Sequence, residues 1–301
     1  MGAFPAVFLA LLIGVGPAPA PPAPEAVVLG VAQDGGVPHL GCRQTLCAEA
    51  RRDPSKRKLV ASLGLTDPAS GKRFVIDATP DFREQVDRLG GLPDAILLTH
   101  AHIGHYLGLA QLGREVLGAK RLPVYCTASM ARFLRENGPW KRLVALENIE
   151  IREIAPGVEF ELTPSLRATA IPVPHRDEDS DTVAYLGSGP SRRLLWLPDI
   201  DKWEKWDRAI EELVRASSLI AFLDGTFFSE DEIPGRSLRE IPHPLVSETV
   251  ARFRGRAPAP PARVFFVHLN HTNRLYWDRS ARRDLERKGF GIAQEGARFP
   301  L

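Results

Sequence analysis

Three histidines within six positions constrain this chain more than any other feature of its sequence. The stretch LLTHAHIGHYLGL, residues 97–109, contains His100, His102 and His105, whereas the whole chain of 301 residues has only eight histidines. The apolar run before His100 predicts a strand, and the pattern after His105 predicts a helix. Side chains in a turn from a strand to a helix converge outside the end of a sheet. Because neutral imidazole is a common zinc ligand, the stretch predicts a metal site at a sheet edge.

Apolar strand-like segments alternate with amphipathic stretches along most of the chain. The predicted strands are residues 26–33, 58–67, 73–78, 95–100, 122–127, 149–154, 159–164, 166–173, 182–188, 192–199, 219–227 and 263–270. Several are apolar on both faces, which is typical of a sheet that other layers cover. Helices are expected at residues 79–91, 105–118, 203–217 and 243–255, the first with Thr79 as its N-cap and Pro80 at its first position. We therefore expect one α/β domain over residues 25–301, built in layers.

The first 24 residues differ from the rest of the chain. Residues 6–16, AVFLALLIGVG, are continuously apolar, but a bilayer span needs about 20 such residues. The small residues Ala18 and Ala20 follow, as in an export signal, and a Pro/Ala linker completes the segment. No Lys or Arg precedes the apolar run, so a mis-assigned start or an N-terminal extension is the alternative. We expect an exported protein, periplasmic or secreted, without stable membrane insertion, and otherwise a cytoplasmic one.

Three further candidate ligands each follow an apolar strand. His175 ends the run TAIPVPH, Asp199 ends RRLLWLPD, and His268 ends RVFFVH. A single polar residue in such a place is more often a loop contact, but the strands of one sheet finish at one rim. We therefore expect these side chains to gather at the histidine cluster. The motif THAHIGH, followed by a lone His, a lone Asp and a last His, resembles that of the metallo-β-lactamase fold superfamily.

This resemblance covers nearly all of residues 25–301 and implies a four-layer αββα sandwich with a metal site at one edge. It implies two sets of ligands, His100, His102 and His175 for one ion and His105, Asp199 and His268 for a second. Asp199 would bridge the two ions. Asp77, in VIDATPD, matches the aspartate that orients the site. The cofactor implied is zinc, as one or two ions, with iron or manganese as alternatives.

Gly104 departs from the superfamily's motif, His-x-His-x-Asp-His. The aspartate of that motif is a ligand of the second metal, and glycine has no side chain to replace it. The second position would keep only His105, Asp199 and His268, and fewer anionic ligands should weaken the binding of a second divalent ion. We therefore expect one firmly held ion. His271 in HLNHTN is a candidate substitute ligand, although a supporting or surface role is the commoner one.

Other segments are similar to the branch of the superfamily that contains pyrroloquinoline quinone biosynthesis protein B. They are VLGVAQDGGVPHLGC, DATPDFREQ, LPDIDKW, FLDGTFF, IPHPLVSET and HLNHTN. The branch also holds ribonuclease Z and cyclic phosphodiesterases, in which a histidine that begins a helix helps to protonate the leaving group. His243 in HPLVSETV occupies that place, and Asp224 in LDGTF resembles its carboxylate partner. The alternative for His243 is a helix cap.

Hydrolysis is the simplest activity for such a site. A divalent ion lowers the pKa of bound water to about 7, so metal-bound hydroxide would attack an ester, a phosphodiester or a similar bond of a small molecule. Asp199 would orient the water, and His243, paired with Asp224, would be the general acid. Two alternatives stay open. One is oxidation with iron and dioxygen in biosynthesis of the quinone cofactor, and the other is a carrier that binds a small anionic cofactor without turnover.

The charge of the chain bears on its class of substrate, and its cysteines bear on possible structural sites. The chain has 39 basic and 37 acidic side chains and no long basic arm, so its charge favours a small-molecule substrate over a nucleic acid. Its oligomeric state is not encoded in any pattern we find. Cys42 and Cys47, near His39, are candidates for a structural metal site, a local bridge or free thiols, and Cys126 is expected in the core.

Overall fold

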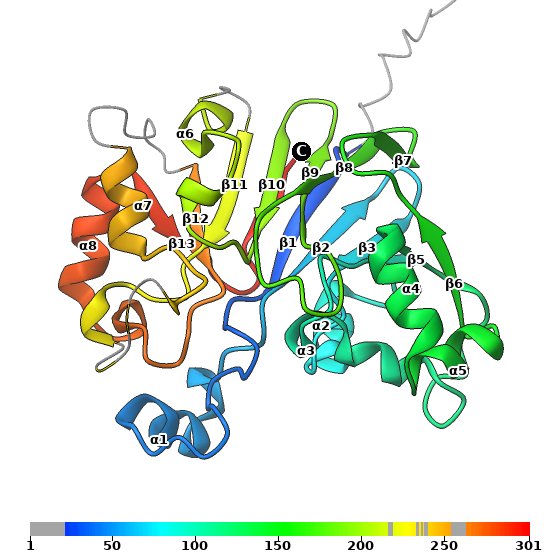
Figure 1. Ribbon diagram of the computed structural model, residues 1–301, viewed down its shortest axis with the longest axis horizontal. Helices are drawn as coiled ribbons and strands as arrows, with labels where there is room; N and C mark the ends of the chain where they lie inside the picture. Colours follow the sequence, from blue (N-terminus) through cyan, green and yellow to red (C-terminus); the bar gives the residue numbers. More distant parts are fainter. Residues whose placement is uncertain (1–21, 216–218, 233–234, 236, 238–239, 254–262) are drawn as a thin grey trace, which may run out of the picture.

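Two seven-stranded β-sheets lie face to face at the centre of the molecule (Figure 1). The computed structural model describes residues 22–215, 219–232, 235, 237, 240–253 and 263–301. The predicted export signal and linker, residues 1–24, therefore lie almost wholly outside the described residues. Within the described residues, no helix has the length and apolar character that a membrane crossing requires.

The first sheet has the strand order β14-β1-β2-β3-β4-β5-β6. Its strands are β14 (Arg298–Pro300), β1 (Glu25–Gly30), β2 (Ser62–Asp67), β3 (Lys72–Ile76), β4 (Ala95–Leu97), β5 (Leu122–Cys126) and β6 (Ile149–Glu153). The pairings from β14 to β3 are antiparallel, and those from β3 to β6 are parallel.

The second sheet repeats this pattern in the order β7-β8-β9-β10-β11-β12-β13. Its strands are β7 (Glu159–Thr163), β8 (Leu166–Pro172), β9 (Val183–Ser188), β10 (Arg193–Leu197), β11 (Leu219–Asp224), β12 (Val264–Val267) and β13 (Phe290–Ile292). The pairings from β7 to β10 are antiparallel, and those from β10 to β13 are parallel. The two sheets thus have the same design, and all but β14 of the first sheet comes from the N-terminal half of the chain.

Helices cover the outer faces of both sheets (Figure 1). Those on the first sheet are α2 (Phe82–Leu89), α3 (Ile103–Tyr106), α4 (Ala128–Glu136) and α5 (Trp140–Ala145), and those on the second are α6 (Ile210–Leu213), α7 (Val246–Arg252) and α8 (Arg279–Arg287). Short 3₁₀-helices span Pro54–Lys56, Leu107–Leu112, Trp203–Lys205, Glu230–Glu232 and Arg274–Tyr276. The remaining helix, α1 (Thr45–Arg52), lies in the long connection from β1 to β2 and projects from the sandwich.

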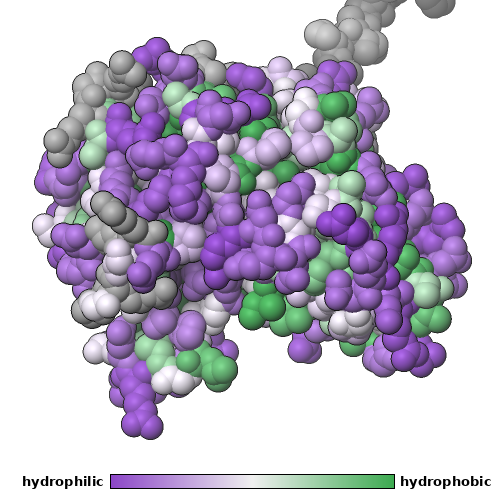
Figure 2. All heavy atoms as spheres, in the orientation of Figure 1, coloured by the Kyte–Doolittle hydropathy of each residue, from purple (hydrophilic) through white to green (hydrophobic). Residues whose placement is uncertain are grey.

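Apolar side chains fill the space between the layers. Leu63 of the first sheet and Tyr185, Trp196 and Phe222 of the second are fully buried where the sheets meet. One further apolar cluster lies under the helices of each sheet. Figure 2 shows that hydrophilic residues cover most of one face of the molecule. The layer order helix, sheet, sheet, helix confirms the predicted αββα sandwich, and burial between these layers supplies its main driving force.

The helix predicted for residues 105–118 differs in the structure. The short helix α3 is followed by the 3₁₀-helix Leu107–Leu112, and residues 113–118 are not helical. Gly108 donates its N–H to Ala78 O (2.8 Å), and a Cβ on Gly108 would lie 2.3 Å from Thr79 O. Tight contact with the segment after β3 therefore overrides the amphipathic pattern of this stretch.

The start of α2 and several short elements also differ from the prediction. Asp81, not Thr79, is the N-cap of α2, and Thr79 Oγ1 accepts a hydrogen bond from Asp81 N (3.1 Å). Of the helix expected at 203–217, residues 216 and 217 lie outside the described residues, and the rest is reduced to a 3₁₀-turn and α6. Among the α-helices and strands of the described residues, α1, α4, α5, α8, β13 and β14 were not predicted.

Candidate metal centre

The strands that run in one direction end at a common edge of the sandwich. Those that lead to polar residues of this edge are β1, β3 and β4 in the first sheet and β8, β10, β11 and β12 in the second. The polar residues that end or follow these strands are Asp34, Asp77, His100, His175, Asp199, Asp224 and His268. Together with the histidine turn and His243, all of them except Asp77 form three groups of possible metal ligands, and the ligand atoms within each group lie within 4.8 Å of one another. The sheet edge therefore collects side chains from the whole length of the chain.

The first group consists of His100, His102 and His175. His100 Nε2 and His102 Nδ1 lie 2.9 Å apart. Both ring nitrogens of His175 are buried and have no hydrogen-bond partner. His102 is the most exposed member, and its Nε2 bonds to Glu178 Oε2 (3.0 Å). The structure thus brings together two residues of one turn and a third from the end of β8.

The second group consists of Asp34, His105, Asp199 and His268. Asp199 Oδ2 lies 2.9 Å from His105 Nε2 and 3.3 Å from His268 Nε2. Asp34 Oδ1 lies 3.5 Å from each of the same two nitrogens. The ligand atoms of a tetrahedral zinc ion are about 3.3 Å apart, so these separations suit one shared ion.

Asp199 lies between the two groups. Its Oδ2 is 3.7 Å from His100 Nε2, and its Oδ1 is 3.7 Å from His175 Nε2. The same carboxylate therefore contacts ligand nitrogens of both groups, and it is buried. Although burial opposes ionisation, the neighbouring His268, His175 and His105 hold the pKa of Asp199 well below its usual range.

Asp77 and Thr99 fix the orientation of two histidines. Thr99 donates its hydroxyl hydrogen to Asp77 (3.0 Å), so its oxygen accepts from His100 Nδ1 (3.0 Å). His105 Nδ1 donates to Asp77 Oδ2 (2.8 Å). With Nδ1 engaged in this way, both imidazoles direct Nε2 into the site, as in many metal-bound histidines. Asp77 adopts this position with φ at +70°, a strained conformation for a residue with a side chain.

Thr226 plays the same part in the second sheet. It donates to Asp224 Oδ1 (2.7 Å), so its oxygen accepts from His268 Nδ1 (3.0 Å) and leaves His268 Nε2 free. His243 Nδ1 donates to Asp224 Oδ2 (2.7 Å). His268 also has a left-handed backbone, with φ at +62°. The third group, Asp224, His243 and His268, is therefore held by hydrogen bonds to Asp224 and Thr226.

The residues of the first two groups fit a divalent metal. Asp34 Oδ1, His105 Nε2, both nitrogens of His175 and His268 Nε2 are buried without hydrogen-bond partners. Buried polar atoms are nearly always paired in folded proteins. His100 Nε2 and His102 Nδ1 also lie 2.9 Å apart, close enough to bind one cation together. Imidazole and carboxylate are the ligands that zinc and similar ions take in proteins.

Burial keeps His100 and His175 in the state that binds metal. Desolvation lowers the pKa of His175 to about 4 and holds the pKa of His100 well below its usual range. Both rings are therefore neutral at physiological pH, and their lone pairs remain available.

Two side chains are placed differently from the expectation based on sequence. His271, the candidate substitute for residue 104, stacks on His39 with 4.2 Å between ring centroids and belongs to none of the three groups. Asp34, which the sequence argument missed, completes the second group. The sequence does mark Asp34 as a candidate ligand, because this residue directly follows the predicted strand 26–33. The expectation that the second position keeps only His105, Asp199 and His268 is corrected accordingly.

The three cysteines are all free. Cys47 is buried, and its sulfur accepts a hydrogen bond from His39 N (3.4 Å). Cys126 is buried, and desolvation raises the pKa of its thiol to about 12. Of the alternatives considered for Cys42 and Cys47, the local disulfide is not formed in the structure.

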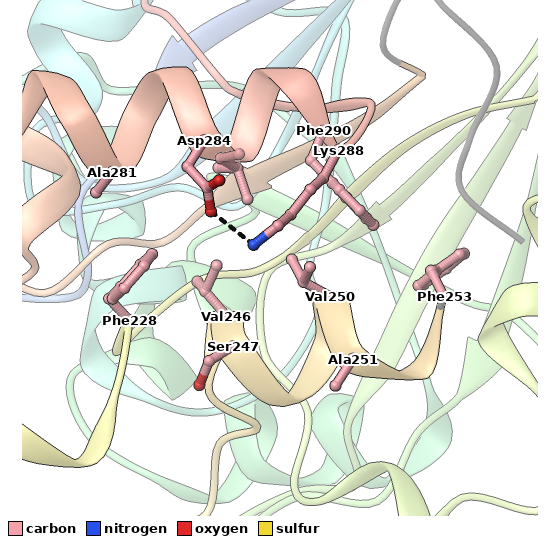
Figure 3. Close-up of a pocket in the computed structure, with 11 residues that line it drawn as sticks. Phe228, Val246, Ser247, Val250, Ala251, Phe253, Ala281, Asp284, Lys288 and Phe290 are labelled. Carbon is pink, nitrogen blue, oxygen red and sulfur yellow. Dashed lines mark hydrogen bonds and ion pairs between the residues drawn. The ribbon is translucent and has the colours of Figure 1, made fainter. Parts of the chain in front are cut away.

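A separate apolar cavity of about 410 Å³ lies between α7 and α8 (Figure 3). Phe228, Val246, Val250 and Phe253 line it on one side, and an ion pair from Lys288 to Asp284 (2.6 Å) lies on the other. None of its lining residues belongs to the three groups. The metal centre is therefore a distinct feature of the sheet edge.

Comparison with known proteins gives one family. The family model described as a beta-lactamase superfamily domain matches residues 72–269. Coenzyme PQQ synthesis protein B of Methylobacterium sp. (strain 4-46) is 26% identical over 312 residues, covering 92% of this chain and 100% of that protein. The protein of the same name from Rhizobium meliloti (strain 1021) is 27% identical over 307 residues, covering 91% of this chain and 97% of the relative.

Solved structures agree on the fold. Zn(2+)-bound PqqB from Methylobacterium extorquens has a TM-score of 0.76 at 22% identity, covering 92% of this chain and 100% of that one. A new diphosphatase from the PhnP family has a TM-score of 0.67 at 25% identity, with coverage of 92% and 97%. The short form of human tRNase Z has a TM-score of 0.56 at 12% identity, with coverage of 92% and 99%. Together with the side chains at the sheet edge, the fold indicates a divalent metal.

Proposed function

The chain belongs to the beta-lactamase superfamily, and from that premise we propose that it is a metal-dependent hydrolase of an ester, phosphodiester or similar bond in a small molecule. The observation that carries the proposal is Asp199. One buried carboxylate contacts ligand nitrogens of two adjacent groups, which is the arrangement expected of a site for one or two zinc ions. Such ions, when bound, supply a Lewis acid and lower the pKa of water.

His243 is placed to give a proton to the leaving group. Its ring lies beside the first group, with 5.4 Å between the centroids of His243 and His175. Although burial opposes protonation, the carboxylate of Asp224 raises the pKa of His243 above its ordinary value. A protonated imidazole is a general acid, and Asp224 fixes its orientation through Nδ1. The likeness to a PhnP-family diphosphatase at 25% identity supports a phosphate-containing substrate.

A role in synthesis of coenzyme PQQ is the second candidate. Relatives with that name cover 91–92% of this chain at 25–27% identity, which supports it about as well as the structural neighbours support hydrolysis. In this reading the centre holds iron and the reaction consumes dioxygen, because histidine and carboxylate ligands with open positions also suit that chemistry.

One experiment separates the candidates. The purified full chain is loaded in turn with zinc, manganese and iron, and its metal content is measured by mass spectrometry. Each form is then assayed with p-nitrophenyl esters and phosphodiesters and, separately, for oxygen consumption. We expect phosphodiester cleavage by the zinc or manganese form, lost in Asp199→Asn. Oxygen consumption by the iron form, with no cleavage by any form, would contradict the hydrolase and support the second candidate.

A further inference from the structure

Gly104 and Asp34 occupy one place at the metal centre. A Cβ on Gly104 would lie 2.0 Å from Asp34 Oδ1 and 2.9 Å from Asp34 Cα. Both distances are far shorter than any non-bonded contact, and one of them involves the backbone. The carboxylate of Asp34 therefore fills the space that a side chain at residue 104 would need.

The free oxygen of this carboxylate points into the second group. Asp34 Oδ1 lies 3.5 Å from His105 Nε2 and 3.5 Å from His268 Nε2, and it is buried without a hydrogen-bond partner. The other oxygen, Oδ2, accepts a hydrogen bond from Gln33 Nε2 (2.9 Å). One oxygen is thus held in place by the protein, and the other is available to a cation.

Backbone pairing holds Asp34 beside His268. Ala32 forms bridges to both Val60 and Leu269, so this segment joins the two sheets. Gln33 N donates to Leu269 O (2.9 Å), and Leu269 N donates to Val31 O (2.9 Å). Asp34 directly follows this ladder on one side, and His268 directly precedes it on the other. The distance between the two side chains is therefore set by the sheets and not by a free loop.

We propose that Asp34 is the carboxylate ligand that the histidine motif lacks, so that the second metal position is complete and Gly104 has to remain glycine. The inference rests on the metal-dependent function proposed above. Without Asp34, the second position would have two imidazoles and one shared carboxylate. With Asp34, it has two imidazoles and two carboxylates. A ligand set of that kind suits zinc and also harder divalent ions such as manganese.

A ligand exchange between the two residues tests the proposal. We compare the wild type with Asp34→Ala, Asp34→Asn, Gly104→Asp and the double variant Asp34→Gly/Gly104→Asp. The double variant returns the aspartate to the motif and removes the side chain that blocks it. Zinc per chain is measured by mass spectrometry after gel filtration in buffered zinc, and the affinity of the weaker ion is measured by chelator competition. Circular dichroism and the melting temperature report whether each variant folds.

We expect two ions in the wild type and one in Asp34→Ala. The affinity for the second ion should fall at least about 10–100-fold, because even the loss of an outer-sphere partner costs that much. Asp34→Asn keeps the volume without the charge and should also lose the ion. The double variant should regain at least about tenfold in affinity over Asp34→Ala.

Several outcomes would overturn the proposal. They are fewer than two ions in the wild type, an unchanged second ion in folded Asp34→Ala and Asp34→Asn, or a folded double variant that regains nothing. If Gly104→Asp does not fold, the other three variants still decide the question. Two ions in the wild type and one in Asp34→Ala uphold the ligand assignment even if no substrate is cleaved, and only the proposed hydrolysis is then contradicted.

Discussion

The two proposed metal positions are built in opposite ways. The first takes two of its three histidines from one turn and contains only imidazoles, apart from the shared Asp199. The second takes His105 from that turn, but its remaining side chains come from the ends of β1, β10 and β12. A position assembled within one turn can be found in a sequence as a motif. A position assembled from four segments depends on the fold as a whole, and one of its residues, Asp34, lies outside any motif that was recognised in the sequence.

The largest effect is expected at Asp199, the residue that the two positions share. Asp199→Asn removes the charge that both share, so both ions should be lost or weakened and phosphodiester cleavage should fall by about 10³–10⁴-fold. Metal analysis and kcat/KM measure the two effects together. Retention of two tightly held ions would show that Asp199 does not bridge the positions.

The next largest effect is expected at His243, and it should change the rate without changing the binding of either ion. His243→Ala should leave metal content unchanged and lower kcat by about 10²–10³-fold with a poor leaving group. With p-nitrophenolate, which needs no proton to depart, the loss should be small. Equal losses with both leaving groups would argue against His243 as the general acid. Asp224→Asn is the matched control, and it should show the same dependence on the leaving group in weaker form.

A histidine of the first position tests whether the two ions bind separately. His102→Ala should remove one ion and leave the other, whereas Asp34→Ala should remove the opposite one. Replacing zinc by cobalt gives each remaining ion its own visible spectrum, since the imidazole-rich and carboxylate-rich sets differ in ligand field. Identical spectra for His102→Ala and Asp34→Ala would mean that the positions are not independent.

The smallest effect is expected at the rim of the first position. Glu178 bonds to His102 Nε2 (3.0 Å) but is 55% exposed. Glu178→Gln should weaken the first ion by about tenfold, at the low end for an outer-sphere partner, because water can replace the carboxylate. The same substitution should leave the second ion unchanged. A change larger than that of His102→Ala would indicate that Glu178 binds the metal itself.

The sequence was sufficient for the layered fold and for most of the site, but for identifiable reasons it was not sufficient for all of it. His175, Asp199 and His268 were found because each ends an apolar strand. The same rule, applied to residues 26–33, selects Asp34, but an aspartate before two glycines also reads as an ordinary turn. The hydroxyls of Thr99 and Thr226 carry no such signal, because threonine is common at strand ends.

Elements that depend on tertiary contacts could also not be predicted from the sequence. The strands β13 and β14 have three residues each, which is too short for a period-two pattern to appear. The segment at residues 105–118 has a helical pattern, yet Gly108 packs so closely on residues 78 and 79 that a regular helix cannot form there. In both cases the deciding partner lies far away in the chain.

The left-handed backbones of Asp77 and His268 bear on how this protein should be handled. Each costs of the order of 1–3 kcal/mol relative to a relaxed residue, although aspartate and histidine tolerate the conformation better than most. An ion that binds only the folded state offsets this cost. Storage in a chelating buffer removes that protection, and the apoprotein should have a shorter shelf life than its dense core suggests.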